Sequence, residues 1–130
     1  MLVLDHIAPP DVAPGNGYTH VVAGTGRLVA ISGQIAFDEA GQLVGCDDAE
    51  AQARQVFENL RRCLTAAGGT FDNVIKLTYY VTDTAWLPAI RRVRDTFVDT
   101  VQPPASTAVQ VAALVRPELL MEIEALAVIP

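Results

Sequence analysis

Two glutamates near the end of the chain have the types and spacing for acid–base chemistry. Glu122 and Glu124 share one face of an expected β-strand, roughly 6.6 Å apart. Paired carboxylates of this kind can hydrolyse glycosides, but few aromatic residues lie nearby to hold a sugar. Leu120 and Leu126 flank the pair, so Glu122 should be partly desolvated and able to exchange a proton with water near neutral pH. Structural hydrogen bonds at a subunit interface are the alternative for both glutamates.

Three short motifs could bind an anion. Ser32-Gly33-Gln34 ends an expected strand and offers a hydroxyl and backbone N–H groups, Ser106-Thr107 begins another strand, and Tyr18 carries a phenol. Each motif also has an ordinary structural explanation, as a strand end, a loop cap or a half-buried strand residue. A Ser/His/Asp arrangement, a phosphate loop and a dinucleotide fingerprint are all missing from the sequence.

Most arginines fall in two expected helices, where exposed faces normally carry charge. This group consists of Arg54, Arg61, Arg62, Arg91, Arg92 and Arg94. Arg116 stands apart in the final turn, where it could bind a ligand at a rim.

Length and composition indicate one domain spanning residues 1–130. Nine basic and 15 acidic residues give a net charge of −6, which argues against a nucleic-acid partner. Cys46 and Cys63 form no disulfide framework, and His6 and His20 lack metal-ligand spacing with them, so we expect neither a metal nor a cofactor. With no long apolar run or basic leader, we expect no membrane partner and a cytoplasmic protein.

Period-2 patterns predict the strands. Residues 18–23 and 28–35 are expected to form a hairpin, with a short edge strand at 2–4, and 72–82 a further strand. The last 26 residues predict two strands, 106–114 and 119–129, joined by a turn at 115–118. In the final strand, all odd positions from 119 to 129 are apolar and predict a core face.

Two helices are expected between these strands. Asp47, three residues before Glu50, suggests a capping box for a helix that Gly68-Gly69 ends. Asp83 or Thr84 can cap a second helix. Its apolar stripe is expected to consist of Trp86, Ile90, Val93, Phe97 and Val101. The order β-β-α-β-α-β-β predicts an α+β fold, a mainly antiparallel sheet with both helices on its aliphatic face.

The other face of this sheet is too apolar for open water. It is expected to carry Leu28, Ala30, Leu120, Leu126 and Val128 beside the glutamates. We therefore predict that copies of the chain close this face in a homo-oligomer, with polar residues gathered where subunits meet.

Five segments in this order resemble the Rid family, also called YjgF. They are Ile31-Ser-Gly-Gln34, residues 51–60, Leu77-Thr-Tyr-Tyr-Val-Thr-Asp83, Pro104-Ala-Ser-Thr-Ala-Val109 and residues 122–128. The resemblance covers about residues 15–129 and implies a chorismate-mutase-like fold. It also implies a homotrimeric barrel with ligand pockets at the subunit interfaces.

Catalytic Rid proteins hydrolyse reactive imines to 2-oxo acids and ammonia. The resemblance implies that Glu122 positions the attacking water, and it carries substrate-binding roles to Tyr18, Ser32 and the adjoining Gly33. The arginine that anchors the substrate carboxylate in the family is Ser106 here, next to Thr107. Removing one partner of a desolvated charge pair costs about 2–5 kcal/mol, so the chain should deaminate small imino acids poorly unless another cation compensates.

Arg91 aligns with a family asparagine and is one candidate for this compensation, as is Arg116; a solvent-facing role for Arg91 is equally compatible with its spacing. Two functions therefore stay open, an imine or enamine hydrolase and a non-catalytic trimer that binds a small metabolite such as a carboxylate. RNA cleavage has been attached to relatives, and the acidic charge argues against it.

Overall fold

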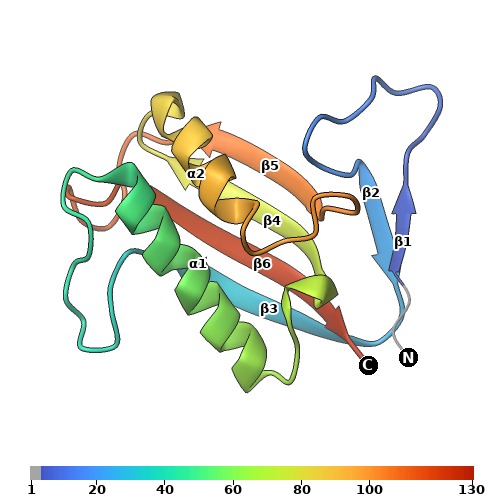
Figure 1. The fold of residues 1–130 in the computed structure, drawn as a ribbon, viewed down its shortest axis with the longest axis horizontal. Helices are drawn as coiled ribbons and strands as arrows, with labels where there is room; N and C mark the ends of the chain where they lie inside the picture. The colour runs from blue at the N-terminus through green and yellow to red at the C-terminus, as the bar shows by residue number, and fades with distance from the viewer. Residues whose placement is uncertain (1–3) are drawn as a thin grey trace.

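A four-stranded sheet is the centre of the computed structural model, which describes residues 4–130 (Figure 1). Its order is β3-β6-β4-β5, with bounds Arg27–Gln34 (β3), Val74–Val81 (β4), Ala105–Gln110 (β5) and Met121–Ile129 (β6). β3 and β4 both run antiparallel to β6, and β5 runs parallel to β4. The α+β fold with a mostly antiparallel sheet is therefore confirmed.

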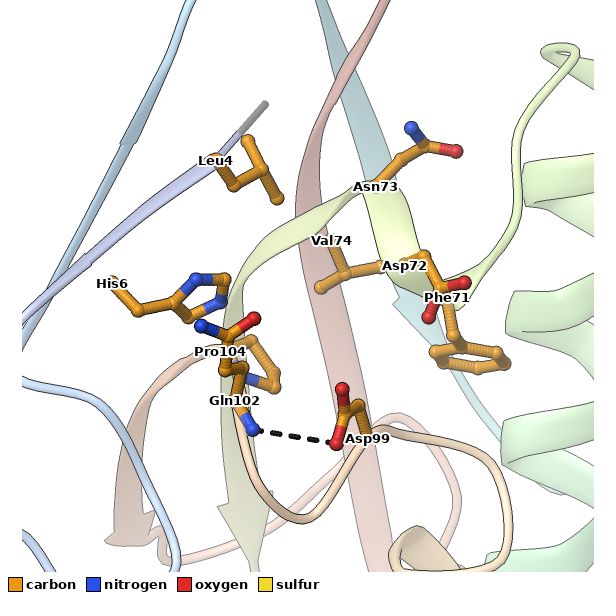
Figure 2. Close-up of a pocket in the computed structure, with 9 residues that line it drawn as sticks. All are labelled: Leu4, His6, Phe71, Asp72, Asn73, Val74, Asp99, Gln102 and Pro104. Atoms are coloured by element: carbon orange, nitrogen blue, oxygen red, sulfur yellow. Dashed lines mark hydrogen bonds between the residues drawn. The ribbon is translucent and has the colours of Figure 1, made fainter. Parts of the chain in front are cut away.

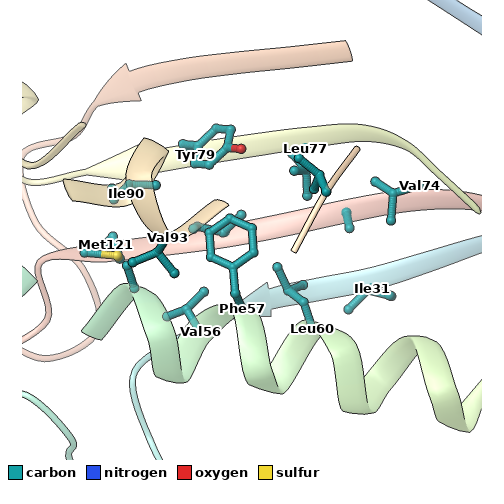
Figure 3. Close-up of a cluster of buried hydrophobic side chains, with 14 of the residues drawn as sticks. Ile31, Val56, Phe57, Leu60, Val74, Leu77, Tyr79, Ile90, Val93 and Met121 are labelled. Carbon is teal, nitrogen blue, oxygen red and sulfur yellow. The ribbon is translucent and has the colours of Figure 1, made fainter. Parts of the chain in front are cut away.

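The core lies between one face of this sheet and the two helices. The odd positions of the final segment are all buried, confirming the period-2 prediction: Leu119, Met121, Ile123, Ala125, Ala127 and Ile129. Val56, Phe57 and Leu60 of the long helix point toward Leu77 and Tyr79 of β4 (Figure 3). Burial of this apolar cluster is the main source of stability.

Helix α1, Ala49–Ala66, covers β6 and β3. Its N-cap is Asp48, whose Oδ1 accepts a hydrogen bond of 3.0 Å from the Ala51 amide. The predicted cap at Asp47 is wrong by one residue, because Asp47 takes a left-handed conformation (φ 57°) in the preceding turn. Gly68, with φ of 89°, follows the helix as predicted.

The second helix, α2, spans Leu87–Arg94 after a 3₁₀ turn at Thr84–Trp86 (η2) that Asp83 caps. It is shorter than predicted, because Thr96 donates its hydroxyl to the Val93 carbonyl and tighter turns replace the helical bonds. Phe97 still packs against Phe57, with ring centroids 5.5 Å apart. Val101, predicted on the buried stripe, is 86% exposed, so that prediction was wrong.

A separate two-stranded sheet stands beside the main one (Figure 1). It pairs β1, Leu4–Ile7, with β2, Val21–Gly24. The predicted hairpin of residues 18–23 with 28–35 is therefore wrong, because β3 pairs with β6 instead. Gly26 packs against the end of β6, where a Cβ would lie 2.7 Å from the Ile129 carbonyl oxygen, so the chain crosses to the main sheet there. The predicted edge strand at 2–4 lies mostly outside the described residues.

The connection from β5 to β6 is longer than the predicted turn, since β5 ends at Gln110. Buried Gln52 of α1 holds the last part of this connection, residues 118–120, in place. The Gln52 Nε2 donates to the carbonyls of Gly45 (3.1 Å) and Glu118 (2.9 Å), and its Oε1 accepts from the Leu120 amide (2.9 Å). Gln52 thus ties the segment entering β6 to the core. The apolar pattern of the helix did not predict that this polar residue is buried.

Candidate functional site

The sheet face that the helices leave uncovered is half apolar, as predicted. Leu28 on β3 is 67% exposed, Val109 on β5 43% and Leu126 on β6 39%. Val128 was predicted on this face and is instead buried, since the chain near Gly26 covers it. Exposed aliphatic groups from three of the four strands thus lie on this face, which favours its burial.

Glu122 and Glu124 line an open cleft of about 270 Å³ on this face. Its other lining residues are Gly33, Tyr80, Val111, Ala113 and Leu114. We call it the glutamate cleft. It places two carboxylates among aliphatic groups, in agreement with the pattern of the final strand.

Gly33 brings β3 into contact with Glu122. A Cβ built on Gly33 would lie 2.7 Å from the carboxyl carbon of Glu122, closer than any real contact. The pairing of β3 with β6 shifts register between Ile31 and Gln34, and this bulge turns the Gly33 backbone toward β6. Glycine is required here because a larger residue would displace the carboxylate.

The two glutamates differ in their partners. The Tyr80 hydroxyl donates a hydrogen bond to Glu124 Oε1, and this bond raises the pKa of Tyr80. Among residues 4–130, no side chain forms a hydrogen bond or an ion pair with Glu122. Glu124 is therefore already engaged, whereas the Glu122 carboxylate is free to hold a water molecule.

A second, much smaller cavity of about 30 Å³ lies between α2 and β5, on the helix side of the sheet. Its lining consists of Tyr79, Leu87, Ile90, Arg91, Arg94, Ser106 and Ala108. We call it the arginine cavity. Two cations and no acidic side chain line it, so it is electropositive in a chain of net charge −6.

The polar groups of the arginine cavity include buried Tyr79 and largely buried Arg94. The Arg94 side chain is 11% exposed, and its Nε and Nη2 donate to Asp95 Oδ1 at 2.9 and 2.8 Å. Tyr79 is 3% exposed, and its hydroxyl has no hydrogen-bond partner among the described residues. Burial raises the pKa of Tyr79 to about 12. The adjacent Arg94 guanidinium and, more weakly, Arg91 act to lower this pKa, while Asp95 acts in the same direction as burial.

The loop that carries Tyr18 lies against the end of α2. A Cβ on Gly17 would be 3.4 Å from the Arg94 Nη2. Thr19 donates to the carbonyls of Pro104 (3.2 Å, from its amide) and Pro103 (2.6 Å, from its hydroxyl). Tyr18 itself is 37% exposed, and the closeness of neighbouring Gly17 to Arg94 places its loop beside the arginine cavity.

The predicted site residues thus fall into two groups that a single chain keeps apart. Arg91 and Ser106 line the arginine cavity, with the Tyr18 loop nearby, while Gly33 and Glu122 belong to the glutamate cleft. The strand registers place Ser106 two strands and three residues from Glu122, roughly 14 Å between Cα atoms and on the opposite face. A small metabolite cannot contact both groups within one chain.

The remaining candidates lie outside both pockets. Ser32 is exposed at the bulge of β3. Thr107 points to the open face, where its hydroxyl accepts a 2.7 Å bond from Lys76 Nζ. Arg116 pairs with Glu118 at 3.3 Å and lies over the Phe37 ring, 5.7 Å from its centroid. Arg116 is therefore engaged away from Ser106.

Sequence reasoning missed Arg94 and Tyr79. It counted Arg94 among the solvated helix residues and placed Tyr79 in the core without noting its hydroxyl. A signal for Arg94 was present, because position 94 follows buried Ile90 by four residues and so shares its side of α2. No local pattern marks the unpaired hydroxyl of Tyr79, which depends on the packing of α2 against the sheet.

A third cavity, of about 270 Å³, lies at the base of β1 and contains none of the predicted site residues (Figure 2). It is lined by Leu4, His6, Phe71, Asp72, Asn73, Val74, Asp99, Gln102 and Pro104. Within residues 4–130, no three His, Cys, Asp or Glu side chains cluster as metal ligands. No helix in that range is long and apolar enough to cross a membrane.

Comparison with known proteins shows which proteins this chain resembles. The family model described as Endoribonuclease L-PSP matches residues 9–129. The chain is 35% identical to a RutC family protein of Synechocystis, covering 95% of this chain and 92% of the relative. It is 36% identical to protein DfrA of Myxococcus xanthus, covering 93% and 89% respectively.

Solved structures match as well. A Rid family protein of unknown function from Yersinia pestis, YyfB, has 38% identity and a TM-score of 0.87, over 97% of this chain and 98% of that one. RidA from a Psychrobacter species has 36% identity and a TM-score of 0.73, over 90% and 92% respectively.

Proposed function

Because the chain belongs to the Endoribonuclease L-PSP family, which includes the Rid (YjgF) proteins, we propose that it binds a small metabolite at the interface between two copies and hydrolyses a reactive imine or enamine there. The observation that carries this proposal is the free Glu122 carboxylate, packed on the Gly33 backbone in an open, half-apolar cleft.

Glu122 acts on water in this proposal. The carboxylate accepts a proton as a water oxygen bonds to the imine carbon, and the C=N π electrons move to nitrogen, which takes up a proton. The resulting carbinolamine then forms C=O and releases ammonia as the C–N bond breaks. A positioned acid–base group contributes roughly 10²- to 10⁴-fold in rate.

Self-association supplies the second half of the site. The glutamate cleft carries two carboxylates and the arginine cavity two guanidinium groups, so one copy's cleft is charge-complementary to the next copy's cavity. The exposed apolar groups Leu28, Val109 and Leu126 add area that favours burial. A closed ring of three copies, a homotrimer, satisfies this head-to-tail contact.

The test is ammonia release from imines generated by an amino-acid oxidase, with wild type, Glu122→Gln and Glu124→Gln. We expect Glu122→Gln to lower the rate about 100-fold or more. Glu124→Gln is the matched control and should change it much less, because Glu124 is engaged by Tyr80. Equal rates in wild type and Glu122→Gln would contradict the proposed role.

A non-catalytic metabolite-binding trimer is the second candidate, favoured by Ser106 at the position where the Rid resemblance places the anchoring arginine. Calorimetry with 2-oxo acids separates the two, since binding without ammonia release supports the second. RNA cleavage, suggested by the family description, is opposed by the net charge of −6. Failure to retain RNA at any salt concentration would dismiss it.

A further inference from the structure

We infer that the arginine cavity is a carboxylate-binding subsite in which Arg94 of α2, assisted by the Tyr79 hydroxyl, holds the acid group of the ligand, and that Ser106 provides the space. This inference deepens the proposed function, on which it rests, by naming the chemical class of the ligand and the residues that select it. The cation that binds the carboxylate is then Arg94 of helix α2, and not a residue of strand β5, where Ser106 stands.

The cavity has the size of an acid group. Its volume of about 30 Å³ accommodates roughly two water-sized atoms. A carboxylate presents two oxygens, so the cavity fits the end of a ligand and excludes its carbon chain. Ser106 is small and half-buried, and a longer side chain at this position would fill the space.

Unsatisfied polar groups line the cavity. The Tyr79 hydroxyl is buried and has no hydrogen-bond partner among the described residues. Such a group lowers the stability of the fold unless a ligand or a water molecule forms a hydrogen bond with it. Asp95 uses the Nε and one Nη2 position of Arg94, which leaves the Nη1 edge available for a second acceptor. An incoming carboxylate can therefore accept from both Arg94 and Tyr79.

The surrounding charges favour an anion. Arg91 lines the same cavity, and no acidic side chain does. Asp95, the nearest competing anion, is 47% exposed and contacts Arg94 alone among the lining residues. Burial strengthens the pairing of a guanidinium with a carboxylate relative to the same pair in water.

The experiment measures binding of 2-oxobutanoate to the full-length chain by calorimetry, with butanone as the uncharged control. We expect 2-oxobutanoate to bind and butanone to bind at least tenfold more weakly. Arg94→Met should weaken 2-oxobutanoate binding about 30-fold or more, and Tyr79→Phe about tenfold. Arg92→Met removes the same charge from an exposed position on α2 outside the cavity and should leave Kd within about twofold.

A rescue variant keeps the test independent of folding defects. Arg94→Lys keeps a positive charge at the same position of α2 and leaves Ser106 unchanged, so it should recover part of the affinity that Arg94→Met loses. Addition of 2-oxobutanoate to wild type should also shift the ultraviolet absorbance of the buried tyrosine, and this shift should be missing in Tyr79→Phe.

The outcomes separate this inference from the proposed function. Arg94-dependent binding of 2-oxobutanoate without imine hydrolysis would support the carboxylate subsite and count against the enzyme. Imine hydrolysis with KM and kcat unchanged in Arg94→Met would overturn the carboxylate subsite and leave the enzyme standing. Equal affinity of wild type and Arg94→Met for 2-oxobutanoate would also overturn it.

Discussion

The glutamate cleft and the arginine cavity lie on opposite faces of one sheet and are built in different ways. The cleft is open, and a strand bulge and one glycine set its geometry. The cavity is small and is lined by buried Ile90 and partly buried Leu87 of α2, so the packing of α2 sets its geometry. Core packing thus sets the geometry of the cationic cavity within one chain, whereas the acidic cleft is open on the uncovered face, where we propose that a second copy closes it.

The two halves also differ in how they tolerate change. A substitution at the cavity alters packed side chains whose positions depend on one another. A substitution at the cleft alters a surface, where function can be lost while stability is kept. The following predictions use this difference, from the largest expected effect to the smallest.

Gln52→Leu should cost about 2–4 kcal/mol of unfolding free energy, because it leaves the Glu118 carbonyl and the Leu120 amide without their buried partner. Chemical denaturation measures this loss. Gln55→Leu, on the same helix and bonded only to Asn59, should cost less than about 1 kcal/mol. Similar costs for the two variants would show that Gln52 does not hold the segment entering β6 to the core.

Gly33→Ala should lower imine hydrolysis about 100-fold by displacing the Glu122 carboxylate, since displacements near 1 Å have effects of that size. Gly41→Ala is the matched control, because open space surrounds it and its φ of 75° makes alanine strained. It should cost about 1 kcal/mol of stability without changing the rate. A Gly33→Ala enzyme with full activity would contradict the positioning role.

Stability should fall between pH 10 and pH 12 because of Tyr79. Its pKa is raised from 10.0 to about 12 in the folded chain, so the stabilisation is fully present below pH 10 and is lost as pH rises through 12. The loss should approach about 2–3 kcal/mol. Denaturation across this range should show the decline in wild type and a smaller one in Tyr79→Phe, and parallel curves would refute the assignment.

Added salt should weaken self-association modestly. Charge attraction between cleft and cavity is screened at high ionic strength, whereas burial of the apolar face is not. Sedimentation at 0.05 M and 0.5 M NaCl should show association weakening only severalfold. A strengthening with salt would indicate that apolar contact alone joins the copies.

Much of the fold could be predicted from the sequence, because it depends on local periodicity. The alternation along 119–129 predicted β6 and its core face correctly. The error with β2 and β3 arose because local periodicity identifies strands but not their partners: β2 pairs with β1, and β3 pairs with β6, which is about 90 residues away in the sequence. Glu122 and Gly33, which line one cleft, were predicted from the strand pattern and the family resemblance, and their roles stay predictions. Arg94 was missed because burial of a charged helix residue depends on tertiary packing.

The central claim is that each site combines Glu122 of one copy with Arg94 of another. The most direct measurement co-expresses Glu122→Gln chains with Arg94→Met chains, each nearly inactive alone, and assays the mixed oligomers for imine hydrolysis. Random mixing restores both groups in about a quarter of the sites, so we expect about a quarter of wild-type activity. Activity no higher than that of the parent variants would place both groups in one chain and contradict the account.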